Sequence, residues 1–213
     1  MIRFYNFEQR SPKWYAMREG RWTGSTAIDL LSDKPTPPES SGDYDNRHMQ
    51  RGRILEPLAA EAYEIKYKTR VQHYGLITNS QYPHAAYSPD GIDANDQTLL
   101  EIKCLGLEKH NAIIDEILPV PTQYMAQIQF GLFISELSAA RLILYNPDSD
   151  VPLHVMDIQP DPEIQAYIKK QLDKRRPAVS TSLRNAQRRY RENHRAEIRK
   201  RRHEYYMRTK QKM

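Results

Sequence analysis

Residues 87–104 have the sequence YSPDGIDANDQTLLEIKC, and this stretch decides the fold of the chain. It predicts a short strand that ends in S-P-D-G, a polar turn, and a second strand over residues 98–104. Because side chains alternate along a strand, Glu101 and Lys103 project from the same face of the second strand. A hairpin-like return of the chain brings Asp90 beside them.

Two carboxylates and a lysine at one strand end have the chemistry of a metal site. Together they can hold a hard divalent cation and orient a water molecule. The alternative is that Glu101 and Lys103 are a surface pair on a half-exposed strand, while Pro-Asp-Gly is an ordinary turn. The spacing alone leaves both interpretations open, and the flanking residues favour the first.

Length and composition exclude several classes of protein. A chain of 213 residues predicts one domain of ordinary size with room for an appendage. Its single cysteine, Cys104, excludes a disulfide framework, a cysteine-based zinc site and a four-cysteine iron–sulfur cluster. The first residues are not typical of a signal peptide, and no apolar run has membrane length. We therefore expect a soluble, cytoplasmic protein with no membrane partner.

Charge is distributed unevenly along the chain. Residues 184–213 contain twelve of the 32 Lys and Arg residues but three of the 27 Asp and Glu residues, a net charge of +9. Residues 1–183 therefore have a net charge of −4. Such a split predicts a polyanionic partner for the C-terminal segment.

Arginines recur in this basic tail at steps of three and four: Arg184, Arg188, Arg191, Arg195, Arg199 and Arg202. In a helix they would form one cationic face, which fits a nucleic-acid backbone. The alternative is a solvated charged helix. We expect a division into a body, residues 1–182, and a basic helical tail, residues 183–213.

The N-terminal region predicts two short helices. Ser11 and Pro12 are a favourable N-cap and first residue for the first helix. Trp14 and Arg18 are four residues apart and share one face of it. Residues 23–25, Thr-Gly-Ser, open the second helix with hydroxyls and free backbone N–H groups, which suit a phosphate. Plain helix capping is the alternative.

A longer helix is expected over residues 46–68, where Pro57 should kink or restart it. Glu56 lies near the buried side of this helix, where a carboxylate is costly unless it is paired or bound to a metal ion. Alternatively, Glu56 caps the segment that begins at Pro57. The remaining expected elements are strands over 71–78, up to Ser88, and over 139–145 and 151–158, with helices over 106–117, 121–135 and 161–174.

Five segments match one family in sequence and in order. They are WYAMREGRWTGS at 14–25, RGRILEP at 51–57, SPDG at 88–91, EIKC at 101–104 and YMAQIQ at 124–129. E-x-K alone is a weak motif, but these five ordered blocks are specific. Together they resemble the lambda-exonuclease, or YqaJ-type, viral recombinase nucleases of the PD-(D/E)xK superfamily. The chain departs from similar members at Gly24 and in its long basic tail.

The resemblance implies an α/β fold with a mixed central β-sheet flanked by helices. It also implies an active site when residues are carried over by matching position. Asp90 and Glu101 would be metal-binding carboxylates, with the Ile102 carbonyl as a further ligand and Glu56 completing the acidic cluster. Lys103 would position and polarise the attacking water.

A second group of residues would bind the substrate. Gln127 matches a glutamine beside the active site. Arg18 and Ser25 match a pocket that binds a 5′-phosphate at the DNA end, with Ser88 and Trp14 beside it. The cofactor implied is Mg²⁺, which Mn²⁺ can replace, because Mg²⁺ prefers oxygen ligands and keeps several waters.

The activity implied is that of a phage-type 5′→3′ double-strand DNA exonuclease that prepares single-stranded tails for recombination. An endonuclease of the same fold, or a non-catalytic DNA-binding assembly protein, are the alternatives. The resemblance further implies a homo-oligomer, a trimer, and a single-strand annealing protein as partner. The location would be the host cytoplasm if the chain is phage-encoded.

Overall fold

A computed structural model describes residues 1–37 and 47–175 of the chain. Its elements are β1 (Ile2–Tyr5), α1 (Pro12–Arg18), the 3₁₀-helix η1 (Gly24–Thr26), α2 (Ala27–Leu31), α3 (Arg47–Tyr67), β2 (Val71–Gln72), β3 (Leu76–Asn79), β4 (Gly91–Asp93), β5 (Leu99–Lys103), α4 (Leu107–Ile114), α5 (Thr122–Ser135), β6 (Ala140–Tyr145), β7 (Leu153–Ile158) and α6 (Pro162–Lys174). No helix within these two ranges is both long enough and apolar enough to span a membrane.

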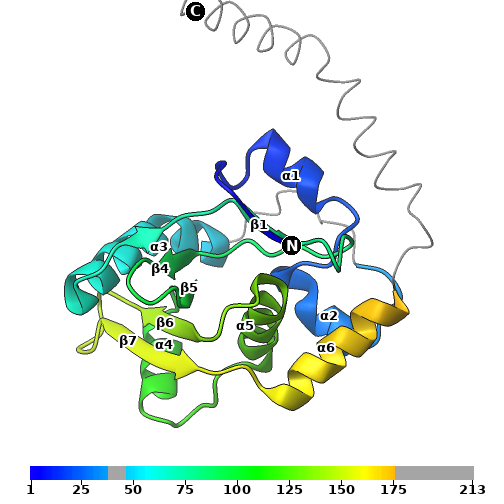
Figure 1. Ribbon diagram of the computed structural model, residues 1–213. Helices are drawn as coiled ribbons and strands as arrows, with labels where there is room; N and C mark the ends of the chain where they lie inside the picture. Colours follow the sequence, from blue (N-terminus) through cyan, green and yellow to red (C-terminus); the bar gives the residue numbers. More distant parts are fainter. Residues whose placement is uncertain (38–46, 176–213) are drawn as a thin grey trace, which may run out of the picture.

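The main sheet has the strand order β2-β4-β5-β6-β7. Strands β5 and β6 are parallel, with Leu99 opposite Ala140, and the other neighbouring pairs are antiparallel. A parallel pair needs a long crossover, which α4 and α5 provide between β5 and β6. The mixed central sheet flanked by helices is therefore confirmed (Figure 1).

The two faces of the sheet are covered by different helices (Figure 1). On one face, Tyr63 and neighbouring alanines of α3 pack against Leu100 and Ile102 of β5. On the other face, Leu99 packs in a larger core with α5, and α2 and α6 lie beside that helix. The predicted alternation along β5 is thus confirmed, because Leu99 and Leu100 belong to different cores.

Helix starts follow the predicted capping chemistry. Ser11 is the N-cap of α1 and its hydroxyl accepts a hydrogen bond from the backbone N–H of Trp14 at 3.3 Å. Asp161 caps α6 in the same way, accepting from the N–H groups of Glu163 and Ile164 at 2.9 and 3.0 Å. Proline follows both caps, where its missing N–H costs nothing.

Two predicted elements differ from the structure. The strand expected over 71–78 is two strands: β2 joins the main sheet, whereas β3 pairs with β1 in a separate two-stranded sheet. Gly75 lies between them against the backbone of Phe7, where a Cβ would be 2.2 Å from the Phe7 carbonyl oxygen. Of the two outcomes predicted at Pro57, a kink or a restart of the helix, the restart does not occur, because α3 is continuous through this residue.

The segment that leads to Ser88 is held by isolated bridges and is not a strand. Tyr87 exchanges two backbone hydrogen bonds with Ile77, with N···O distances of 2.6 and 2.9 Å. Ala85 forms a parallel bridge with Trp22 on the other side. Residues 84–87 therefore run between the N-terminal region and β3, and this placement fixes the start of S-P-D-G.

A buried ionic network holds the far end of the β4–β5 hairpin. Asp93 is 2% exposed and accepts hydrogen bonds from the Tyr63 hydroxyl at 2.6 Å and from Arg141 Nη1 at 3.1 Å. Arg141 also pairs with Asp96 at 2.6 Å, in the turn of the hairpin. These contacts fix the hairpin register and lie at the opposite end from Asp90.

Candidate active site

The hairpin places Asp90 beside the second half of β5. Strand β4 begins at Gly91, which is paired with Leu100, so Asp90 lies next to the following residues of β5. The Asp90 Oδ2 atom accepts a hydrogen bond from the backbone N–H of Ile102 at 2.7 Å. The side chain of Gln9 supports this turn by donating to the Pro89 carbonyl oxygen at 2.7 Å.

Glu101 is fully buried, with 0% of its surface exposed, and two side chains donate to its carboxylate. Lys103 Nζ lies 2.5 Å from Oε1. The Tyr87 hydroxyl lies 2.5 Å from Oε2. Both carboxylate oxygens therefore have a fixed donor, and each retains a lone pair for a further partner.

Lys103 remains cationic in this setting. Burial lowers the pKa of its ammonium group, but the carboxylates of Glu101 and Asp90 outweigh burial and raise the pKa above its ordinary value. The ammonium group also lies 3.4 Å from Oε1 of Gln127 and 5.2 Å from the centre of the Tyr124 ring. A cation held in this way can stabilise developing negative charge, and it is a poor general base.

Glu56 lies across a cleft from the hairpin. A cavity of about 360 Å³ is lined by Glu56, His73, Asp90 and Ile102, together with other residues of α3. Burial raises the pKa of Glu56, and the Glu101 carboxylate raises it further, although Arg10 acts in the opposite direction. Burial also raises the pKa of Asp90 well above its ordinary value, and Glu101 and Glu56 add to this effect.

These carboxylates have the chemistry that a hard cation requires. In residues 1–37 and 47–175, no three His, Cys, Asp or Glu side chains are gathered closely enough to hold a metal ion. However, Asp90, Glu101 and Glu56 repel one another electrostatically, as the raised pKa values of Asp90 and Glu56 show. A divalent cation among oxygen donors would relieve this repulsion, so the donor set fits Mg²⁺.

Next to this site, Arg18 is surrounded by hydroxyl groups. Its Nη1 donates to Ser88 Oγ at 3.1 Å, and its Nη2 donates to Thr23 Oγ1 at 3.3 Å and Ser25 Oγ at 3.2 Å. Trp14 stacks under the guanidinium at 4.1 Å and donates from Nε1 to Ser88 Oγ at 2.8 Å. Helix α1 and the η1 turn therefore converge on Ser88.

The Arg18 pocket favours an anion. Burial lowers the pKa of the guanidinium to about 10, because the charge is desolvated among neutral hydroxyls. An oxyanion would compensate this desolvation through two parallel N–H···O bonds. The surrounding hydroxyls can donate to the same anion.

The structure brings the predicted site residues together in two adjoining groups. Asp90, Glu101, Ile102, Lys103 and Gln127 lie on the hairpin and on α5, with Glu56 across the cleft. Trp14, Arg18, Ser25 and Ser88 form the second group. The six tail arginines, Arg184, Arg188, Arg191, Arg195, Arg199 and Arg202, lie outside the described residues.

The sequence patterns did not assign three further residues to the site. Thr23 was noted only as part of a helix start, yet its hydroxyl contacts Arg18. His73 lines the cleft and its Nδ1 lies 3.2 Å from the Asp90 carbonyl oxygen. Tyr87 looked like an ordinary strand residue. A single polar residue in a loop or strand gives no pattern that could have identified them.

The fold and the site together define a class of protein. A carboxylate before β4 and an E-x-K sequence on a central strand, with the lysine paired to the glutamate, are the features of a PD-(D/E)xK nuclease-type site. The chain matches the model of the YqaJ-like viral recombinase domain over residues 13–138. It belongs to this family.

Solved structures show the same fold. The chain is similar to LHK-Exo, an alkaline exonuclease from Laribacter hongkongensis, with 24% identity and a TM-score of 0.66 over 85% of this chain and 99% of that one. It is equally similar to LHK-Exo in complex with dAMP, with 24% identity and a TM-score of 0.67 over 89% of this chain and 99% of that one. A search of curated proteins gave no match.

Proposed function

We propose that this protein is a Mg²⁺-dependent deoxyribonuclease that digests double-stranded DNA from a 5′ end. The main support is that one short segment, residues 88–90, joins the pocket around Arg18 to the carboxylate site. Ser88 contacts Arg18 in the Arg18 pocket, which is called the anion pocket from here on. Asp90, two residues later, contacts strand β5, which contains the E-x-K sequence. A terminal phosphate in the pocket would thus hold a nearby phosphodiester over the carboxylates and Lys103.

Asp90, Glu101 and Glu56 would hold the cation, with the Ile102 carbonyl as a further ligand. When bound, Mg²⁺ would polarise a phosphoryl oxygen and lower the pKa of the attacking water. Lys103, fixed by Glu101, would hold that water and stabilise negative charge on the phosphoryl group. Gln127, which lies against Lys103, would orient the same water or the phosphate.

The anion pocket would provide the end specificity. Its guanidinium and the hydroxyls of Thr23, Ser25 and Ser88 would bind a 5′-phosphate, and Trp14 would hold the guanidinium in place. Hydrolysis that releases a 5′-mononucleotide leaves a new 5′-phosphate on the shortened strand, and this phosphate would enter the pocket and hold the DNA end for the next cleavage. Processive digestion from the 5′ end follows from this tether. The resemblance alone supports a trimer and an annealing partner.

The test compares linear, nicked circular and intact circular duplex in Mg²⁺, Mn²⁺, Ca²⁺ and EDTA. We expect digestion of linear DNA with Mg²⁺ or Mn²⁺ and none in EDTA. Ca²⁺ should bind without supporting turnover, because it is larger and less exacting in its geometry. Full activity in excess EDTA would contradict the metal site.

The same assay separates the alternative functions. Cleavage of intact circles would favour an endonuclease of the same fold. Binding to DNA without cleavage under any condition would favour a non-catalytic assembly protein. The complete set of E-x-K residues, with Lys103 2.5 Å from Glu101, argues against a decayed active site.

The basic tail should increase DNA affinity without affecting the chemistry. We propose that the basic tail contacts duplex phosphates, because residues 184–213 have a net charge of +9 while residues 1–183 have a net charge of −4. Truncation after Ser182 should weaken DNA binding steeply at physiological salt. It should also flatten the slope of log K against log salt by roughly 4, since each of about four or five phosphates contributes about 0.9.

Equilibrium binding at several salt concentrations, with the mass in solution measured alongside, checks this prediction. Single-turnover cleavage at saturating protein should remain close to wild type, because the site residues precede the tail. An unchanged salt slope would show that the tail is not on DNA and would indicate a protein partner.

A further inference from the structure

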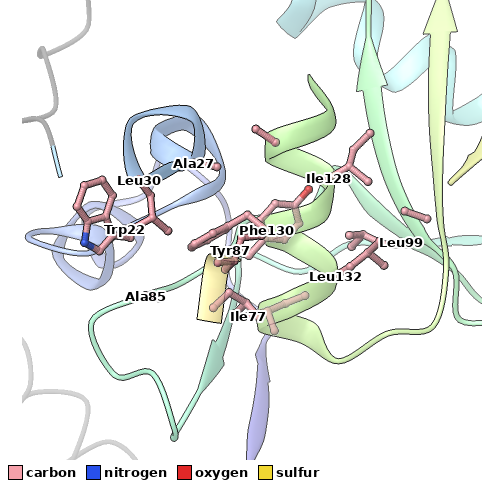
Figure 2. Packing of buried hydrophobic residues seen from close by; sticks show 14 of the residues in the cluster. Trp22, Ala27, Leu30, Ile77, Ala85, Tyr87, Leu99, Ile128, Phe130 and Leu132 are labelled. Carbon is pink, nitrogen blue, oxygen red and sulfur yellow. The ribbon is translucent and has the colours of Figure 1, made fainter. Parts of the chain in front are cut away.

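Tyr87 lies between the two groups of residues at the site, with its hydroxyl on Glu101 and its ring against Gly24. It is fully buried, and its hydroxyl donates to Glu101 Oε2 at 2.5 Å. Its backbone is held by Ile77, and the next residue is Ser88 of the anion pocket. Its ring belongs to the buried cluster that includes Phe130 of α5 (Figure 2).

Two glycines make room for the Tyr87 ring. A Cβ at Gly24, in the η1 turn of the anion pocket, would lie 2.8 Å from Cε2 of the ring. A Cβ at Gly131, on α5, would lie 2.5 Å from Cζ. Real Cβ atoms do not approach a ring so closely, so neither position accepts a larger residue unless the ring moves. The hydroxyl is therefore fixed in direction by packing as well as by its hydrogen bond.

The hydroxyl and Lys103 together determine the orientation of the Glu101 carboxylate. Lys103 holds Oε1 and Tyr87 holds Oε2, each at 2.5 Å. Rotation of the carboxylate would break at least one of these hydrogen bonds. Because the site is buried, the polar group left without a partner would lower the stability of the fold. The free lone pairs therefore have a fixed direction, as metal-binding carboxylates with outer hydrogen-bond partners do.

We propose that Tyr87 is a positioning residue, which orients the Glu101 carboxylate for a divalent cation. This inference rests on the proposed function, since it assigns Glu101 to the cation. A tyrosine that served only the core would need some hydrogen-bond partner, but it would not need this one. Its loss would then lower stability and leave cation binding unchanged.

The test is Tyr87→Phe, which keeps the ring and removes the hydroxyl. Loss of an outer partner of a metal ligand typically costs about 10–100-fold in metal affinity or activity. We expect Mn²⁺ binding, measured by electron paramagnetic resonance without DNA, to weaken by about tenfold or more. The Mg²⁺ midpoint of single-turnover cleavage should rise by a similar factor, while the preference for 5′-phosphorylated ends is retained.

The matched control is Tyr63→Phe. Tyr63 is also fully buried, and its hydroxyl donates to the buried carboxylate of Asp93, which is paired with Arg141. The two tyrosines thus have the same local chemistry at opposite ends of the hairpin. Tyr63→Phe should lower the melting temperature. It should leave Mn²⁺ binding and the Mg²⁺ midpoint of single-turnover cleavage unchanged. Gly24→Ala, which pushes on the ring, should shift the midpoints in the same direction as Tyr87→Phe.

The outcomes separate this inference from the proposed function. If Tyr87→Phe lowers only the melting temperature, as Tyr63→Phe does, the positioning role is overturned and the nuclease proposal stands. If the wild-type protein shows neither Mn²⁺ binding nor cation-dependent cleavage, the proposed function fails and this inference fails with it. Equal shifts in both tyrosine variants would indicate a general loss of hairpin order and would also overturn it.

Discussion

Asp90→Asn, Glu101→Gln and Lys103→Ala should each reduce DNA cleavage to background while leaving the protein folded. The first two remove a charge needed to hold the cation. The third removes the ammonium group that lies 2.5 Å from Glu101, and loss of one such electrostatic group typically costs about 10²–10³-fold in rate. Single-turnover cleavage of linear duplex in Mg²⁺ measures each effect, with circular dichroism to verify folding.

Lys109→Ala is the matched control for the lysine. Lys109 lies 5.7 Å from the centre of the same Tyr124 ring as Lys103, but its side chain is on the exposed part of α4. It should retain wild-type turnover. Near-normal turnover in Asp90→Asn or Lys103→Ala would show that the site is misplaced. Glu56→Ala should also reduce cleavage severely, because it removes the carboxylate across the cleft.

Arg18→Ala should erase the preference for 5′-phosphorylated over 5′-hydroxyl ends. The guanidinium is buried among hydroxyls, and its charge-assisted bonds to a phosphate are worth about 1.5–3 kcal/mol each. Loss of one such bond corresponds to about ten- to a hundredfold, so digestion of phosphorylated ends should slow by at least this factor. Digestion of hydroxyl ends should change little. Digestion of phosphorylated ends should become less processive. Initial rates on the two substrates, with gel analysis of product length, measure the effect.

The exposed Arg70 offers a control, since it pairs with Glu64 on the surface at 3.2 Å. Arg70→Ala should retain the wild-type end preference. If Arg18→Ala also retains it, the phosphate pocket lies elsewhere, and the endonuclease interpretation gains support. Arg18→Lys should give an intermediate result, because lysine keeps the charge but not the paired N–H donors.

Local chemistry explains what the sequence predicts well. The caps at Ser11 and Asp161, each followed by proline, determine where two helices begin. The period of two in β5 correctly places Glu101 and Lys103 together, because alternate side chains of a pleated strand point to the same face. The family motifs predicted that Trp14, Arg18, Ser25 and Ser88 lie together, and these side chains do contact one another.

Long-range packing explains what the sequence could not predict. Residues 71–78 were expected to form one strand, yet they divide between two sheets, and Gly75 lies between these strands against Phe7. Nothing near Tyr87 in the sequence indicates that its hydroxyl reaches Glu101. The contact between Gly24 and the Tyr87 ring is likewise not indicated by the sequence. Such contacts join residues far apart in the chain.

The proposed nuclease removes nucleotides from the 5′ end of a duplex at one site. The most direct measurement is a time course on linear duplex with one label at the 5′-phosphorylated terminus and a second label at the 3′ terminus of the same strand. We expect the 5′ label to appear first, in mononucleotides, and the 3′ label to follow after a delay that increases with length. Early release of the 3′ label, or labelled internal fragments that precede mononucleotides, would contradict it.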